Sequence, residues 1–249
     1  MESNQVNASA PSPTFSPLYQ QIKTLIVRAL ESGEWKPGDL IPSEAELAVR
    51  FGVSQGTTRK AIDEMAAEKL LVRRQGKGTF VATHKDPSSS LRFLRIAAND
   101  GDLPPLTNVP VECWRAKAGV DVARALAIEP GAPVIIVRRV LQAGGEPVVF
   151  DEIYLPGALF HDLTIDALDN AEASLYGVYE SKYGVRAIAA DERLRAVSAD
   201  RLTAGMLQVA EGSPLLLVER VTFTYGNKPV ELRRGFYLTQ KFHYHNELG

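Results

Sequence analysis

The second half of the chain contains one pattern twice. Residues 131–155, GAPVIIVRRVLQAGGEPVVFDEIYL, align with residues 212–238, GSPLLLVERVTFTYGNKPVELRRGFYL, at an offset of 81 that becomes 82 after a one-residue insertion. Each copy has a Gly-x-Pro turn, a strand, a glycine turn and a return strand, which is typical of a β-hairpin, and each follows a short helical stretch. Two copies are too few for a solenoid. We therefore expect one α+β domain in which both hairpins contribute to a single antiparallel sheet.

The first third of the chain predicts three helices followed by a β-hairpin. Apolar residues from Leu18 to Leu30 recur at helical spacing up to Gly33. Ser43 and Glu46 form a capping-box pattern that opens a second helix over about residues 44–50. Ser54 is the expected N-cap of a third helix, and LLVRR-QGKG-TFVA then predicts two short strands around a turn. This order is typical of a winged helix-turn-helix.

The charges divide the chain in the same way. Residues 14–85 carry 11 Lys and Arg against 8 Asp and Glu, and the remainder carries 17 against 22. Only the first part therefore favours a polyanionic partner. The polar segment HKDPSSS predicts a linker. We expect a disordered tail over 1–13, a DNA-binding domain over 14–83, a linker over 84–90 and a second domain over 91–245.

The location expected from composition is the cytoplasm. Cys113 is the sole cysteine, so an intrachain disulfide is impossible and a reducing compartment is favoured. No apolar stretch approaches the ~20 residues that span a bilayer. The N-terminal residues lack the charged and apolar regions of a signal peptide. We expect no membrane association.

The start of the third helix is built for contact with DNA. In a helix-turn-helix the first turns of the second helix of the motif enter the major groove, where small polar residues allow close approach. Gln55 and Arg59 share a helical face, and both side chains suit base edges or phosphates. In the hairpin, cations surround an uncluttered turn that could reach the minor groove or the phosphates. The expected DNA contacts are Ser54, Gln55, Gly56, Thr57, Thr58, Arg59, Arg73, Arg74, Gln75, Gly76 and Lys77.

Residues 17–82 resemble the DNA-binding domain of the GntR family of bacterial transcription regulators, especially in PGDLIPSEAELA, FGVS, TTRKAI and GKGTFV. The resemblance implies DNA contacts at the start of the third helix and in the wing. Two positions depart from the family pattern. Ala45 stands where an arginine is common, and Gln55 stands where an arginine is frequent. We therefore expect an altered base preference with phosphate binding retained.

The second domain is similar to the effector-binding domain of the HutC branch of that family, the UTRA domain, which has a chorismate-lyase-like α+β fold. The resemblance implies a small, polar or anionic effector that contacts Arg139, Asp151, Glu231 and Tyr237. Arg233 shares a strand face with Glu231, and Tyr237 joins them unless Gly235 introduces a bulge. Alternatively, Asp151 and Glu231 lie on a solvated face, and Arg139, which recurs as Arg220, serves only the architecture of the sheet.

One position bears on the kind of effector. Sugar-phosphate binders of this branch tend to have a second arginine two residues after the first, and Leu141 occupies that position here. Arg138 cannot replace it, because adjacent residues of a strand point to opposite faces. We expect a carboxylate or neutral polar ligand, or a weak phosphate site.

Two other functions compete with ligand-controlled repression. The second domain could be a lyase-like enzyme, or it could be a dimerisation module without a ligand. The sequence contains none of the metal, nucleophile-elbow or Walker motifs that we sought, and His243 and His245 lack a nearby third ligand. We therefore expect no catalytic residues, no cofactor and no metal. The favoured hypothesis is a homodimer that binds double-stranded operator DNA as an inverted repeat and is released by a small-molecule effector.

Overall fold

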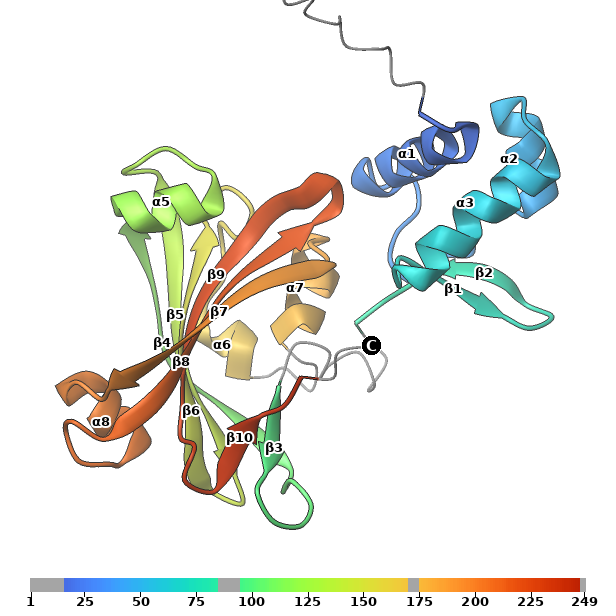
Figure 1. Cartoon of the computed structure of the whole chain (residues 1–249). Helices are drawn as coiled ribbons and strands as arrows, with labels where there is room; N and C mark the ends of the chain where they lie inside the picture. Colours follow the sequence, from blue (N-terminus) through green and yellow to red (C-terminus); the bar gives the residue numbers. More distant parts are fainter. Residues whose placement is uncertain (1–15, 85–94, 170–174, 247–249) are drawn as a thin grey trace, which may run out of the picture.

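The computed structural model describes residues 16–84, 95–169 and 175–246, which form two parts (Figure 1). The predicted tail and residues 85–90 of the predicted linker lie outside the described residues. His84, the first residue of that linker, is instead buried, at 3 % exposure. No described helix is both long and apolar enough to cross a bilayer.

The N-terminal part has the predicted three helices and hairpin. These are α1 (Leu18–Glu31), α2 (Glu44–Phe51), α3 (Gln55–Ala67), β1 (Leu71–Arg74) and β2 (Gly78–Val81). The capping box is present, because Ser43 Oγ accepts from the Glu46 amide while the Glu46 carboxylate accepts from the Ser43 amide at 2.8 Å. Apolar side chains from all three helices and the hairpin make one core, including Ile26, Leu47, Ile62 and Leu71.

The second part is a six-stranded antiparallel sheet in the order β4-β5-β6-β9-β8-β7. Its strands are β4 (Leu106–Lys117), β5 (Pro133–Ala143), β6 (Glu146–Pro156), β7 (Ala189–Ser198), β8 (Pro214–Thr224) and β9 (Lys228–Tyr237). The two repeated hairpins are β5–β6 and β8–β9, and they meet in the middle of the sheet where β6 pairs with β9. The α+β fold with a shared antiparallel sheet is confirmed.

The repeat extends to details of the strand pairing. Each hairpin follows a short helix, α5 (Val120–Leu126) or α8 (Arg201–Leu207). The register shifts between Leu141 and Gln142 in the first hairpin, and between Thr222 and Phe223 at the equivalent place in the second. The pairing of β6 with β9 runs through Gly235 without a shift, so Gly235 introduces no bulge there.

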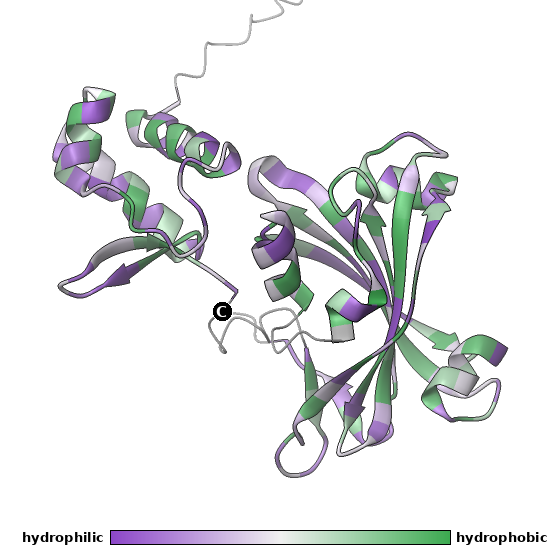
Figure 2. Cartoon of the chain, turned by 180° about the vertical axis from the view of Figure 1, so that it is seen from behind, coloured by the Kyte–Doolittle hydropathy of each residue, from purple (hydrophilic) through white to green (hydrophobic). Residues whose placement is uncertain are grey.

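The two faces of the sheet have different covers. Helices α5 and α8 pack on one face. Helices α6 (Ile165–Asp169) and α7 (Leu175–Tyr183) pack on one end of the opposite face, while the ribbon of β3 (Ile96–Ala98) and β10 (Phe242–Tyr244) packs near the other end. Between these two covers lie the polar residues of the candidate ligand site. Figure 2 shows hydrophilic residues along the wing hairpin and hydrophobic segments along the strands of the large sheet.

Candidate DNA interface and ligand site

The first turn of α3 is held by its own cap. Ser54 Oγ accepts from the Thr57 amide at 3.1 Å and is 2.8 Å from Thr57 Oγ1. Ser54, Gln55 and Gly56 are exposed. A Cβ added at Gly56 would meet only Ser54 Oγ, at 3.9 Å, so the fold itself does not require glycine there. The open surface at this turn suits close approach of a DNA backbone.

A single carboxylate holds the two cations nearest to this turn. Glu44, the first residue of α2, accepts from Arg59 Nε and from Arg73, each at 2.8 Å. Arg73 also pairs with Asp63 at 2.8 Å. The hydrogen bond to Glu44 raises the pKa of the Arg59 guanidinium. Because the side chains of Arg59 and Arg73 are 59 % and 43 % exposed, both can exchange Glu44 for a phosphate or a base edge.

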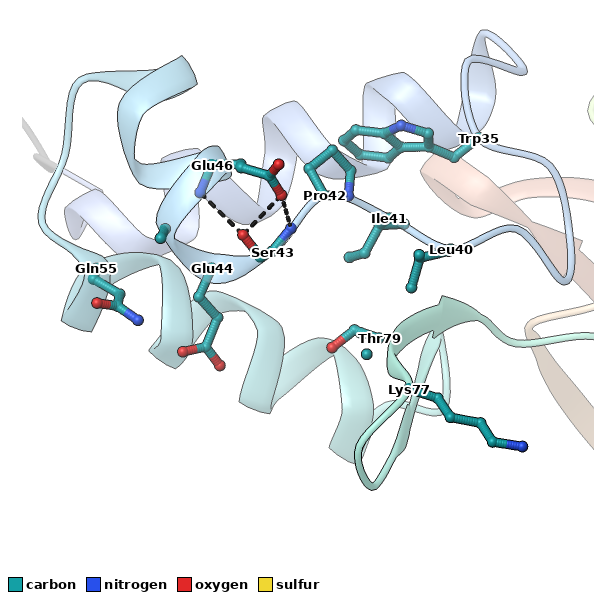
Figure 3. A pocket seen from close by; sticks show the side chains of 12 residues that line it. Trp35, Leu40, Ile41, Pro42, Ser43, Glu44, Glu46, Gln55, Lys77 and Thr79 are labelled. Atoms are coloured by element: carbon teal, nitrogen blue, oxygen red, sulfur yellow. Dashed lines mark hydrogen bonds between the residues drawn. The ribbon is translucent and has the colours of Figure 1, made fainter.

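A cleft of about 720 Å³ lies between the start of α2, the start of α3 and the wing, and Glu44 borders it. Figure 3 shows Gln55, Glu44 and Thr79 along it, with Lys77 of the wing at its edge. Ala45, where the family pattern has an arginine, also lines the cleft. The recognition helix and the wing therefore present polar side chains to the same space.

The wing is exposed at its tip. Arg73, Arg74, Gln75, Gly76 and Lys77 are all exposed. Gly76 has a φ of +70°, a conformation that glycine adopts without strain. Arg74 lies over the ring of Phe80, with its Cζ 4.8 Å from the ring centroid, so it is directed along the hairpin surface.

The predicted DNA contact at Thr58 is wrong. Its exposure is 0 %, and its Oγ1 has no hydrogen-bond partner among the described residues. The side chain lies on the same helical stripe as Ala61 and Ile62, three and four residues later, which face the core. Thr58 therefore cannot contact DNA without a rearrangement of this core. The other predicted contacts are exposed or half-buried.

The predicted ligand residues meet on the sheet face between α7 and the β3–β10 ribbon. Glu231 on β9 is 0 % exposed and accepts from Tyr176 and Tyr179 of α7, from Thr222 of β8 and twice from Arg233. These donor distances run from 2.8 to 3.2 Å. Burial opposes ionisation, but Arg233 and the hydrogen bonds lower the pKa of Glu231 below its ordinary value.

Asp151 on β6 joins the two hairpins. Its Oδ2 accepts from Arg139 Nε at 2.9 Å and from Arg233 at 3.3 Å. Its Oδ1 is buried and has no hydrogen-bond partner among the described residues. A Cβ at Gly235 would lie 2.9 Å from this Oδ1 and 2.7 Å from the Tyr237 ring, so any other residue there would displace Asp151 or Tyr237. Asp151 thus has an acceptor that is shielded from solvent and has no donor among the described residues.

The solvated-face alternative for Asp151 and Glu231 is wrong, because both are almost fully buried. Arg139 is 8 % exposed, and Tyr237 is 4 % exposed beside Asp151. Burial, with the Asp151 charge, raises the pKa of Tyr237 to about 12. Sequence reasoning therefore brought together Arg139, Asp151, Glu231, Arg233 and Tyr237 correctly, while their contact with a ligand stays a prediction.

Several residues of this polar cluster were not predicted. Arg220 binds Glu192 of β7 with its Nε at 2.6 Å, and Tyr244 of β10 donates to the same carboxylate. The repeat could have indicated Arg220, because it is the equivalent of Arg139. Tyr176 and Tyr179 lie three residues apart on α7, a spacing that puts them on one helical face. Their hydrogen bonds with Glu231 depend on tertiary contacts that no local sequence pattern predicts.

The cluster is balanced in charge. Three arginines (Arg139, Arg220 and Arg233) are paired with three carboxylates (Asp151, Glu192 and Glu231). Leu141, at the position of the family's second arginine, is 6 % exposed and packs with Ile96, Val149 and Tyr237. This site therefore has no guanidinium at that position. His243 binds Asn99 at 3.0 Å, and no group of three described His, Cys, Asp or Glu residues could hold a metal ion.

Comparison with known proteins identifies both parts. The family described as "Bacterial regulatory proteins, gntR family" matches residues 18–81, and the UTRA domain family matches residues 107–243. The chain belongs to the GntR family. Its pairing of a GntR DNA-binding domain with a UTRA domain is that of the HutC-like regulators, as the sequence predicted, and makes this GntR protein a ligand-responsive, DNA-binding transcription regulator.

Individual relatives agree with this assignment. The histidine utilization repressor of Pseudomonas putida is 31 % identical over 226 residues, which cover 88 % of this chain and 87 % of that protein. The ligand-binding domain of a GntR-family regulator from Bordetella bronchiseptica is 43 % identical with a TM-score of 0.62, over 64 % of this chain and 98 % of that one. A possible regulator from Bacillus subtilis shares the fold along 94 % of this chain and 100 % of its own, at 20 % identity and a TM-score of 0.56.

Proposed function

We propose that this GntR protein is a cytoplasmic homodimer that represses transcription from an inverted-repeat operator and leaves the operator when a small polar metabolite binds the UTRA domain. One short recognition helix reaches too few base pairs for specificity, so two half-sites are needed. A relative of 31 % identity is named as a repressor, which supports repression rather than activation.

The buried, unpartnered Oδ1 of Asp151 carries the proposal for the ligand. A buried acceptor without a partner costs free energy, and a ligand donor that reaches it recovers that cost. The ligand therefore presents a hydroxyl or N–H group to Asp151. The balanced charges around it and the leucine at position 141 favour a neutral polar molecule or a single carboxylate over a phosphate.

The test is a thermal-shift screen of a metabolite library against the full-length protein. Each hit is then tested for its effect on binding to operator DNA selected in vitro. We expect at least one polar compound that raises the melting temperature and weakens operator binding, and Asp151→Asn should reduce the affinity for that compound. A protein that binds DNA tightly but responds to no compound would argue for a dimerisation module without a ligand.

A sugar phosphate provides the sharpest contrast. The proposal predicts weak or no saturable binding of sugar phosphates. Leu141 leaves Arg139 without a second arginine on its face of the strand, and Arg220 and Arg233 are already paired with carboxylates. Saturable binding of such a compound that is lost in Arg139→Ala would contradict the proposed ligand class while leaving the regulator itself intact.

A further inference from the structure

The tip of the β8–β9 hairpin is part of the effector domain in the sequence, but its side chains pack against the DNA-binding domain. Tyr225 begins the short 3₁₀ turn η1 (Tyr225–Asn227) between these strands. It is 9 % exposed and lies in the hydrophobic cluster formed by Ile22, Ile26 and the rest of the winged-helix core. The turn also contacts α1, as Figure 1 shows. The hairpin therefore anchors one domain in the core of the other.

Arg186 makes the second connection, to the end of the recognition helix. Its guanidinium donates to the carbonyl of Lys69 at 2.9 Å and to that of Leu70 at 3.2 Å, just beyond α3, and to Tyr225 Oη at 3.2 Å. Lys69 has a φ of +59°, which ends the helix and turns these carbonyls outward. A cation at a helix C-terminus is favourable. Arg186 is 3 % exposed, so this contact is dry.

Helix α7 makes the third connection, to the end of the DNA-binding domain. Glu180 accepts from the Thr83 hydroxyl and from the His84 amide, the latter at 2.9 Å. His84 Nε2 lies 2.8 Å from the carbonyl of Ala187, which can only accept, so this nitrogen carries the proton. Glu180 is 6 % exposed and lies 4.0 Å from Arg186 Nε. The chain leaving β2 is thus fixed to α7.

The same two elements reach the ligand site. Helix α7 places Tyr176 and Tyr179 on Glu231, one turn from Glu180. Strands β8 and β9 carry Thr222 and Glu231, which pair in the last part of the hairpin, before a register shift, two further pairs and the turn that begins with Tyr225. A ligand donor that competes for Glu231 would therefore displace the hydrogen bonds that hold α7 and the β8–β9 hairpin in place. Both of these elements contact the DNA-binding domain.

We propose that Tyr225, Arg186 and Glu180 form an interdomain dock that sets the position of the recognition helix. The dock responds to the ligand site through the hydrogen bonds that Glu231 accepts from α7. The proposal rests on the proposed function of the site and assigns its regulatory route. The signal passes through packed side chains at the dock, in addition to any effect on the covalent linker.

The first experiment uses a permanent change in the pocket in place of an unidentified ligand. Affinity for operator DNA, selected in vitro by the wild-type protein, is measured for Glu231→Gln in three backgrounds. We expect this change to alter the dissociation constant about fivefold or more in the wild-type background, as for ordinary allosteric coupling. In an Arg186→Gln background we expect a change of less than about twofold. Arg138→Gln, a matched change on the other sheet face, should keep the full response.

An equal response in the Arg186→Gln and Arg138→Gln backgrounds would overturn the dock as the route, and so would the lack of any response in the wild type. Arg186→Lys gives a second dock variant that keeps the buried charge. It should lose most of the coupling, because one ammonium cannot replace the fork of donors to two carbonyls.

The second experiment tests the dock without DNA. It can therefore support or contradict the dock even if no operator is found and the proposed function fails. Trp114→Phe leaves Trp35, which is buried in the winged-helix core, as the reporter of that domain's unfolding. We expect Tyr225→Ala to lower the melting temperature seen by Trp35 by about 4 °C or more. The exposed neighbour Lys228→Ala should leave it unchanged. An unchanged Trp35 transition in both variants contradicts the dock.

Discussion

The two domains hold their arginines in opposite ways. The side chain of Arg59 in the recognition helix is 59 % exposed and leans on one carboxylate, Glu44. The side chain of Arg233 in the effector domain is 7 % exposed and has carboxylates of two residues around it. An exposed ion pair contributes little to stability and can be exchanged for DNA at small cost. A buried pair cannot lose one member without stranding the other. The charge of Arg59 therefore remains available to a partner in the first domain, while the charges around Arg233 specify a fixed geometry in the second.

The largest expected loss of stability comes from a mutation that breaks the buried cluster of ion pairs. Asp151→Ala should destabilise the effector domain by about 3–5 kcal/mol, because Arg139 is left buried without its main partner. Urea unfolding followed by Trp114 fluorescence measures the change. The control is Glu112→Ala, whose side chain is 50 % exposed and pairs with Arg138, and whose effect should stay within about 0.5 kcal/mol. Similar losses of stability in the two variants would contradict the contrast between buried and exposed ion pairs.

The next effect concerns DNA. Arg59→Ala should weaken operator binding about tenfold or more and leave the melting temperature unchanged, because its side chain is exposed and contributes to recognition rather than to the core. Fluorescence anisotropy with a labelled operator at fixed salt measures this. Lys60→Ala is the matched control, since Lys60 is the neighbouring cation on α3 and lies over the ring of Tyr19, with its Nζ 4.0 Å from the ring centroid. Equal losses from both variants would mean that α3 contributes only general positive charge.

A smaller effect appears with pH. The pKa of Glu231 is lowered in the folded protein by Arg233 and its hydrogen bonds, against the effect of burial. The unfolded chain therefore binds the proton more readily, and the stabilisation is complete above a pH of about 4.5 and is lost as the pH falls through the folded pKa. Urea midpoints between neutral and acidic pH measure this loss. A Glu231→Gln protein should lose part of the slope.

The smallest expected effect concerns the ion pairs that Glu44 makes with Arg59 and Arg73. Glu44→Gln should raise the affinity for non-specific DNA and lower the ratio of operator to non-specific binding by about two- to fivefold, because Arg59 and Arg73 lose the negative charge that they share. Competition binding with random-sequence duplex measures the ratio. An unchanged ratio would mean that Glu44 serves only the start of α2.

Local patterns predicted most of the fold. The capping box at Ser43 depends on residues three apart, and the repeated hairpins depend on turns and alternation within about 25 residues, so each could be seen in the sequence. Thr58 was assigned to the wrong side because its polarity was given more weight than its spacing from Ala61 and Ile62. That spacing was available and indicated the core.

Tertiary contacts account for what was missed. Glu180, Arg186 and Tyr225 lie in segments with no strong local pattern, and their partners are 39 to 117 residues away in the chain. Tyr225 sits in a Tyr-Gly-Asn stretch that predicts only a turn. That this turn enters another domain's core follows from how two folded parts meet, and the turn sequence contains no sign of it.

The central ion pair of the candidate ligand site depends on a difference between the two repeated hairpins. Asp151 and Arg233 occupy equivalent positions in the two repeated hairpins, and they bind each other where β6 pairs with β9. Two identical hairpins would have placed two aspartates or two arginines there, and like charges repel. Because both hairpins lie in one chain, each copy carries a different residue at this position. The sheet therefore holds an asymmetric ion pair that a symmetric assembly of identical halves cannot form.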